Sequence, residues 1–215
     1  MTRRILLSTL AAVLLAAFAA AAGATLAGGP PRAPRPKSGA APWPAPRDAM
    51  KRARLAGLVP EPAEQLAYHV HSHLDVFVNG AHVRVPAGIG INTHDPRVHH
   101  GTLPDGTVGY GGINPACRHP CISPLHTHAS YGLLHTETRT RTPNRLGQFF
   151  VEWGVRLNRR CVGGYCKPDS IRVYVNGKRY RGDPRRILLA NHTEIAVVIG
   201  SLPKHIPSKF PPVPL

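Results

Sequence analysis

Two Asn-Gly pairs, at residues 79–80 and 176–177, constrain the fold of this chain more than any other feature of its sequence. Each pair follows a segment in which side-chain character alternates, residues 70–78 and residues 171–175. Asn-Gly between such segments is the strongest short-range hairpin signal, because a type I′ turn requires positive φ at both central residues. The sequence therefore predicts two β-hairpins.

A helix and a terminal strand are predicted around the second hairpin. Four large apolar residues between 146 and 153 recur at i, i+3, i+4 and i+7, which is the spacing of one helical face. We expect this helix to begin at residues 142–143, where Pro occupies the first helical position, and to end at Gly154. Residues 194–199 are apolar enough to form a central strand.

The order of hairpin, histidine-rich insertion, helix, hairpin and terminal strand predicts an α+β fold, with one helix packed on a small mixed β-sheet. This order is β-grasp-like, and a β-sandwich is the alternative. Shorter elements are also expected: a helix over residues 48–58 with Asp48 as its N-cap, and strands over residues 87–91 and 187–189. Residues 92–124 are expected to form a long loop.

The N-terminus has the composition of an export signal. Basic residues are followed by an apolar run, so residues 1–27 are predicted to be a signal peptide or an uncleaved transmembrane signal anchor. Residues 28–66 are predicted to be a proline-rich linker with a short helix, residues 67–202 a single globular histidine-rich domain, and residues 203–215 a proline-rich tail. The protein is therefore expected to be secreted or held on the extracytoplasmic side of a membrane.

The chain is strongly basic, with a formal net charge of +16. Such a charge is typical of proteins that bind nucleic acid, but an exported protein meets anionic envelope polymers and lipid head groups first. We therefore expect the membrane as a partner and no nucleic acid; a solvated basic surface with no specific partner accounts for the charge, and anionic envelope polymers as partners are the alternative.

The four cysteines form two closely spaced couples, Cys117 with Cys121 and Cys161 with Cys166. In an exported chain an even number of cysteines indicates disulfides. Local pairing within each couple is preferred because each couple brackets a turn. A zinc site of all four cysteines and crossed pairing are the alternatives.

Histidine is the main candidate for metal ligation. Eleven of the 13 histidines lie between residues 69 and 135, many of them two residues apart. Side chains two apart on a strand point to the same face, so such pairs can converge on one ion. The predicted ligands are His71, His73, His126, His128 and His135, with His69, Asp75 and Glu137 as further candidates.

Neutral imidazole suits zinc or copper, and the two methionines are too few for a methionine-rich copper(I) site. With three histidine ligands and an open position, a bound water would be activated for hydrolysis, with Glu137 as general base. The alternative is a hydrogen-bonded histidine network without metal. The remaining histidines are expected to be surface residues: His82, His94, His99, His100, His119, His192 and His205.

Several segments carry a resemblance to a known group of proteins: residues 73–80 (HLDVFVNG), 123–128 (SPLHTH) and 146–155 (LGQFFVEWGV). With these motifs the chain resembles a family of uncharacterised exported proteins, mainly actinobacterial. The resemblance covers about residues 68–202 and implies one exported domain, but no mechanism.

Three functions follow from these patterns. The first is a non-catalytic cell-envelope protein that binds zinc or copper through a histidine cluster. The second is a metal-dependent hydrolase with a three-histidine site. The third is an envelope interaction module whose histidines are structural.

Overall fold

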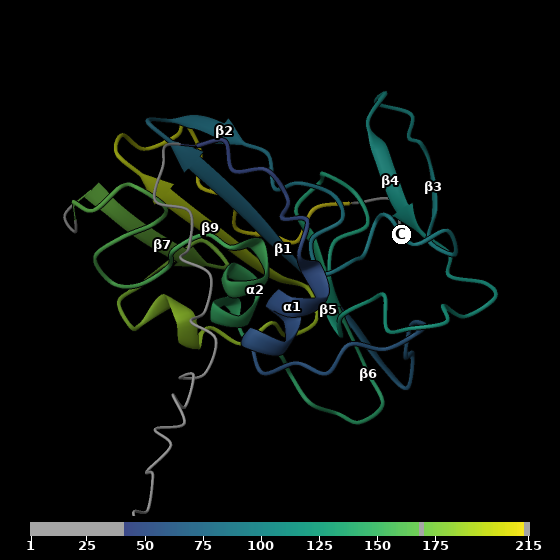
Figure 1. Cartoon of the computed structure of the whole chain (residues 1–215). Helices are drawn as coiled ribbons and strands as arrows, with labels where there is room; N and C mark the ends of the chain where they lie inside the picture. The colour runs from purple at the N-terminus through teal and green to yellow at the C-terminus, as the bar shows by residue number, and fades with distance from the viewer. Residues whose placement is uncertain (1–40, 168–169, 213–215) are drawn as a thin grey trace, which may run out of the picture. The chain divides into compact units, whose positions relative to one another are not determined.

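A mixed β-sheet carries six of the 13 histidines. The computed structural model describes residues 41–167 and 170–212, all within a unit that spans Ala33–Leu215. In these residues the sheet has seven strands in the order β5-β6-β1-β9-β7-β8, with β2 paired to the end of β1, and β3 and β4 form a separate hairpin (Figure 1). The elements are α1 (Ala49–Leu55), β1 (Tyr68–Val78), β2 (Ala81–Val83), β3 (His99–Thr102), β4 (Val108–Gly111), β5 (Leu125–His126), β6 (Leu133–Thr138), α2 (Leu146–Trp153), β7 (Ile171–Val175), β8 (Lys178–Tyr180), the 3₁₀ helix η2 (Pro184–Arg186) and β9 (Thr193–Ile199).

The α+β prediction is confirmed. Strands β1 and β9 are parallel neighbours in the middle of the sheet, with Ser72 opposite Thr193 and Val78 opposite Ile199, while the other pairs are antiparallel. A central parallel pair flanked by the arms of two hairpins is the β-grasp-like order. The sandwich alternative is not adopted, because helix α2 and not a second large sheet covers the apolar face.

Both Asn-Gly turns form as predicted. Asn79 and Gly80 have φ of 50° and 81°, and Asn176 and Gly177 have φ of 49° and 75°. Positive φ at two successive positions is the type I′ geometry that these residue types favour. The local sequence therefore sets the register of both hairpins.

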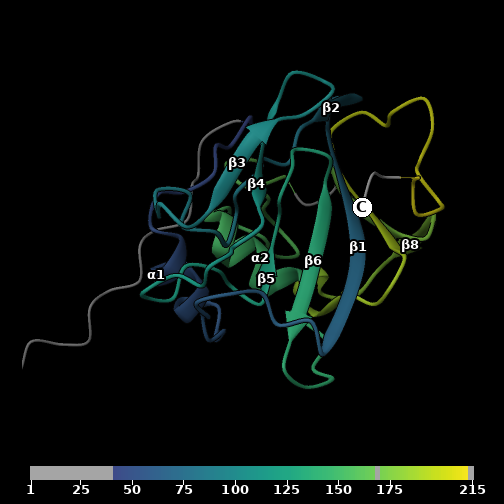
Figure 2. The same cartoon turned by 90° about the vertical axis from the view of Figure 1, so that its right-hand side faces the viewer.

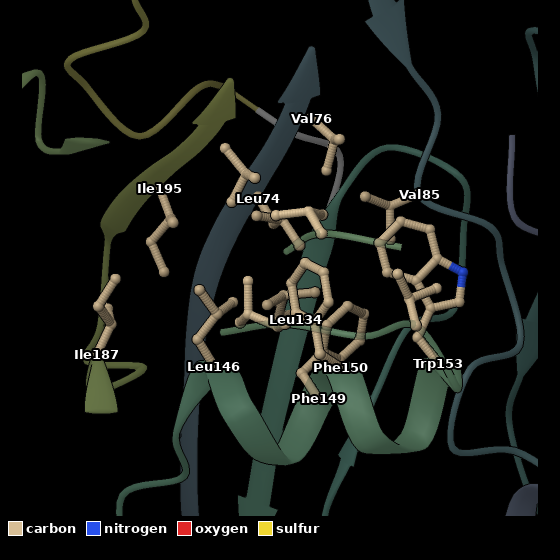
Figure 3. Packing of buried hydrophobic residues seen from close by; sticks show 14 of the residues in the cluster. Leu74, Val76, Val85, Leu134, Leu146, Phe149, Phe150, Trp153, Ile187 and Ile195 are labelled. Atoms are coloured by element: carbon tan, nitrogen blue, oxygen red, sulfur yellow. The ribbon is translucent and has the colours of Figure 1, made fainter. Parts of the chain in front are cut away.

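The core lies between helix α2 and one face of the sheet. Phe149, Phe150 and Trp153 point from the helix toward Leu74 of β1 and Leu134 of β6 (Figure 3). Full burial of each large apolar side chain contributes about 1.5–3 kcal/mol. The apolar helical face predicted from residue spacing is thus the face that packs against the sheet.

The described part of the predicted linker contributes to this core. Trp43 is buried, its ring meets that of Trp153 edge-on at 5.7 Å, and Trp153 Nε1–H donates to the Trp43 carbonyl oxygen at 2.9 Å. Ala49 and Ala53 of α1 are buried as well. From residue 41 onward this segment therefore packs against the domain.

Both helices have ends that differ from the prediction. Helix α2 begins at Leu146 and not at residues 142–143, because Arg145 is extended (φ −126°) and its N–H donates to Gln148 Oε1. Gly154 ends the helix in the left-handed conformation, as expected. Asp48 precedes α1, but its carboxylate pairs with Arg52 at 2.7 Å and does not cap the helix.

Three segments differ from the prediction in conformation. Residues 87–91 form turns and not a strand, because Gly88 and Gly90 have φ of 77° and 75°. Residues 187–189 follow η2 as irregular chain. The expected loop at residues 92–124 contains the β3–β4 hairpin, so His99 and His100 lie on a strand, still exposed.

Both predicted disulfides are present. Cys117 is bonded to Cys121, and Cys161 to Cys166. Two disulfides indicate an oxidising, extracytoplasmic environment. The predicted signal or anchor at residues 1–27 lies outside the described residues, and within residues 41–167 and 170–212 no helix is both long and apolar enough to cross a membrane.

Candidate metal centre

Strands β1, β6 and β5 bring histidines together on the sheet face opposite helix α2. In the antiparallel register His69 lies opposite Glu137, and His71 and His126 both lie opposite His135. Directly opposed residues project from the same face of a sheet, while the core residues alternate with them on the other face. Figure 2 shows β5, β6 and β1 side by side. The predicted pairs at residues 126–128 and 135–137 therefore meet the predicted array on β1.

The tautomers of His126 and His128 are set by backbone carbonyls. His126 Nδ1–H donates to the Ser123 carbonyl oxygen at 2.8 Å, and His128 Nδ1–H donates to the Tyr110 carbonyl oxygen at 2.6 Å. A carbonyl oxygen can only accept, so in the neutral rings both Nε2 atoms carry lone pairs. These two Nε2 atoms are 3.1 Å apart. Two lone pairs at this distance repel unless a cation lies between them.

The separation of 3.1 Å between His126 Nε2 and His128 Nε2 fits two ligands of one ion. Zinc–nitrogen bonds of about 2.0–2.1 Å place two tetrahedral ligands about 3.3–3.4 Å apart. Orientation of each ligand by a hydrogen bond from its other ring nitrogen is typical of metal-bound histidine. This pair therefore has the geometry of two of the four ligands of a tetrahedral metal ion.

Glu137 supplies a carboxylate beside this pair. Its Oε1 lies 3.7 Å from His126 Nε2, 3.3 Å from His135 Nδ1 and 3.2 Å from His69 Nε2. Its Oε2 is buried and has no hydrogen-bond partner among the described residues. A buried carboxylate oxygen without a partner is rare, because desolvation is unfavourable unless a hydrogen bond or an ion offsets it.

His135 stands between two sets of imidazoles. Its ring centroid lies 5.3 Å from that of His126 and 4.4 Å from that of His128, and 4.5 Å from that of His71 on the other side. Two overlapping groups result, and in each group one ligand atom per residue lies within 4.8 Å of all the others. They are His126, His128, His135 and Glu137 in the first group, and His69, His71 and His135 in the second. The described residues thus contain buried histidine and glutamate groups that can hold a metal ion.

Burial keeps several of these imidazoles neutral. It lowers the pKa of His135 from 6.5 to about 2, with further lowering by the neighbouring histidines, His128 first. Burial likewise holds the pKa of His126 well below 6.5 and lowers that of His71. Neutral imidazole is the metal-binding form, so these residues offer lone pairs at neutral pH without first losing a proton.

His73 and Asp75 do not belong to this cluster. His73 Nδ1–H donates to Glu194 at 2.9 Å and Nε2–H donates to the Tyr131 carbonyl oxygen at 2.7 Å, so both ring nitrogens are engaged. Burial opposes the charged form of His73, but the hydrogen bond and charge of Glu194, with Asp75, raise its pKa above 6.5. The ring nitrogens of His73 thus face Glu194 and Tyr131 and not the other histidines, and His73 belongs with Asp75 and Glu194 to a separate group that can itself hold a metal ion.

Asp75 is also occupied elsewhere, because its carboxylate accepts from His82 Nε2 at 2.9 Å. His73, Asp75 and Glu194 form a third, separate group. Spacing placed His73 on the correct face, but it did not reveal Glu194, which lies 121 residues away on the neighbouring strand.

Two glycines allow the backbone to approach the histidines closely. A Cβ at Gly111 of β4 would lie 2.8 Å from His128 Nδ1, and a Cβ at Gly90 would lie 2.4 Å from the Leu125 carbonyl oxygen and 3.0 Å from His126 Cβ. These approaches bring the β3–β4 hairpin against His128 and the 87–91 turn against His126. The sequence analysis assigned neither segment to the site.

A second carboxylate near the site comes from the predicted linker. Glu64 Oε1 lies 3.9 Å from His128 Nε2. Burial raises the pKa of Glu64, and the charge of Glu137 raises it further. Glu64 lies in a proline-rich segment without periodic pattern, so no local signal in the sequence marks it as part of this site.

The site is closed on the side of Glu137. The gap beside Glu137 and His126, lined also by Glu64 and Pro124, has no room for a water molecule. His126 is fully buried, whereas the side chains of His69 and His128 are 35% and 24% exposed. A metal ion therefore has access past His69 and His128.

No protein-family model, no curated protein and no solved structure matches this chain. The resemblance to exported actinobacterial proteins therefore stays a prediction. The case for function rests on the geometry of the histidine cluster.

Proposed function

We propose that this protein is an exported cell-envelope protein that binds one transition metal ion, zinc or copper, without catalysing a reaction. The ligands are His126, His128, His135 and Glu137. The observation that carries the proposal is the 3.1 Å approach of His126 Nε2 to His128 Nε2 while both Nδ1–H groups donate to carbonyls. A metal ion between these lone pairs turns a repulsive contact into two coordinate bonds.

The closed surroundings of Glu137 support binding over hydrolysis. A general base must reach a metal-bound water and a substrate, and the gap beside Glu137 has no room for a water molecule. Imidazole and carboxylate suit both zinc and copper, so the donor set alone does not select one metal. The protein therefore sequesters, transfers or is stabilised by its ion.

The third function is an interaction module with structural histidines. It predicts a proton, and not a metal ion, between His126 and His128. A proton shared by His126 and His128 would also relieve the repulsion between their lone pairs. Burial of His126 disfavours that charge, because it lowers the imidazole pKa. The two disulfides support the exported, extracytoplasmic part of the proposal, because they need an oxidising compartment.

The test uses purified full-length protein dialysed against Zn(II) or Cu(II) and compares unfolding temperatures and metal content. A metal at 100 times its Kd stabilises the folded state by about 2.7 kcal/mol, which is roughly 5–11 °C for a chain of this size. His126→Ala reduces the shift, because it removes a ligand of this ion, while His94→Ala, an exposed histidine outside the cluster, keeps the full shift. If neither metal changes the unfolding temperature of the parent protein, the histidine cluster is structural.

A further inference from the structure

The cluster contains more ligands than one ion needs. A tetrahedral ion takes four donors, and the proposed site already has four in His126, His128, His135 and Glu137. Two imidazoles remain beside them, His69 and His71 of β1. Both lie near His135 across the strand pair, with ring centroids 5.7 Å and 4.5 Å from it.

His71 provides an independent sign of a missing ligand. Its Nε2 is buried and has no hydrogen-bond partner among the described residues. The rings of His69 and His71 are 4.5 Å apart and nearly perpendicular. One ligand atom of His71 lies within 4.8 Å of a ligand atom of His69 and of a ligand atom of His135. A buried lone pair next to other lone pairs is a position for a cation.

We propose that the cluster is a two-metal centre, in which His69, His71 and His135 hold a second ion and Glu137 bridges it to the first. This inference rests on the proposed metal-binding function. Glu137 Oε1 lies 3.2 Å from His69 Nε2 and 3.7 Å from His126 Nε2, so it reaches both groups. Its Oε2 is buried and unpartnered, which leaves the carboxylate free to bond two ions.

The five histidines divide between two ions, with Glu137 shared by both. A neutral imidazole has one lone pair, so His135 completes the second ion when both positions are filled. The first ion then has His126, His128 and the bridging Glu137, with Glu64 3.9 Å from His128 Nε2 as the nearest further carboxylate. Ions in bridged sites lie about 3.5–4 Å apart, which suits groups that share a residue. Solvent completes both ions past the exposed side of His69 and His128.

The test measures copper per chain in the full-length protein after equilibrium dialysis, together with the electron paramagnetic resonance of the bound Cu(II). We expect two ions per chain, with less integrated signal than the copper content because nearby Cu(II) ions couple magnetically. His71→Ala and His69→Gln should each reduce the content to one ion and restore full signal intensity per copper. His205→Ala, an exposed control, should keep two coupled ions.

The outcomes separate this inference from the proposed function. One ion per parent chain, lost in His126→Ala but kept in His71→Ala, overturns the two-metal centre and leaves the single site intact. Two ions that remain in His71→Ala and His69→Gln also overturn it. No bound ion overturns both proposals. Far-UV circular dichroism of each variant verifies the fold, and the His69→Gln variant serves if His71→Ala does not fold.

Discussion

Gly111 of the β3–β4 hairpin lies close against His128, although the sequence predicted a loop at these residues. The Nδ1–H of His128 donates to the carbonyl oxygen of Tyr110, and a Cβ on Gly111 would lie only 2.8 Å from that same Nδ1. The β3–β4 hairpin thus orients a proposed ligand without supplying one. Such outer contacts fix the ring and the tautomer of metal-bound histidine.

Gly111→Ala should therefore weaken metal binding while the fold stays intact. The added methyl group displaces His128 from its carbonyl partner, and loss of an orienting contact typically costs about 10–100-fold in metal affinity. The matched control is Gly101→Ala on the paired strand of the same hairpin, where a Cβ meets no atom within 4 Å. Zinc titration by calorimetry measures the difference. Equal affinities in the two variants would exclude an orienting role for the hairpin.

The metal-free protein should lose stability as the pH falls below 6.5. His126 and His135 have folded-state pKa values below the ordinary 6.5, so the unfolded chain binds more protons between those values. Each of the two histidines then costs about 1.4 kcal/mol of unfolding free energy per pH unit. His73 has the opposite shift, so its contribution is fully present below pH 6.5 and is lost as the pH rises from 6.5 through its folded pKa.

Urea unfolding at pH 7.0, 6.5 and 5.5 measures this dependence, and burial of Glu152, which raises its pKa well above 4.5, acts in the opposite direction in the parent and in each variant. The His135→Gln variant has no imidazole to protonate at this position. The slope of its unfolding free energy against pH should therefore be smaller by the contribution of about one proton. Unfolding free energies that stay level from pH 6.5 to 5.5 would mean that these imidazoles are already charged in the folded protein.

Glu194→Gln should destabilise the protein without changing its metal content. The substitution leaves the buried His73 without its charged partner, and breaking a buried ion pair costs roughly 3–5 kcal/mol. Arg139→Gln removes the exposed ion pair with Glu61 and should cost only about 0–1 kcal/mol. Denaturant unfolding and metal analysis report the two effects separately. A loss of bound metal in Glu194→Gln would place His73 in the metal centre after all.

Trp43→Ala should unfold the protein at markedly lower denaturant concentration. Trp43 is buried against Trp153, and truncation of a buried aromatic residue costs about 3–5 kcal/mol. Val59→Ala changes an exposed residue of the same segment and serves as the control. If both variants unfold like the parent protein, residues 41–66 act as a linker and not as part of the domain.

Local sequence chemistry determined the parts of the fold that depend on near neighbours. Asn-Gly at residues 79–80 and 176–177 predicted both hairpins because few other residues tolerate two positive φ values in succession. The spacing from Leu146 to Trp153 predicted the helix face, and the two cysteine couples predicted the disulfides. The pairs at 126–128 and 135–137 predicted four residues that the structure brings together.

Only the tertiary structure decided which of those side chains meet. Spacing by two specifies a face of a strand, so it could not separate His71 from His73 on β1. The parallel pairing of β1 with β9 brings Glu194 to His73, so the His73 ring contacts Glu194 and does not join the histidine cluster. The antiparallel pairing of β1 with β6 brings His135 to His71. Contacts such as Glu64 with His128 join segments far apart in the chain, and no local propensity encodes them.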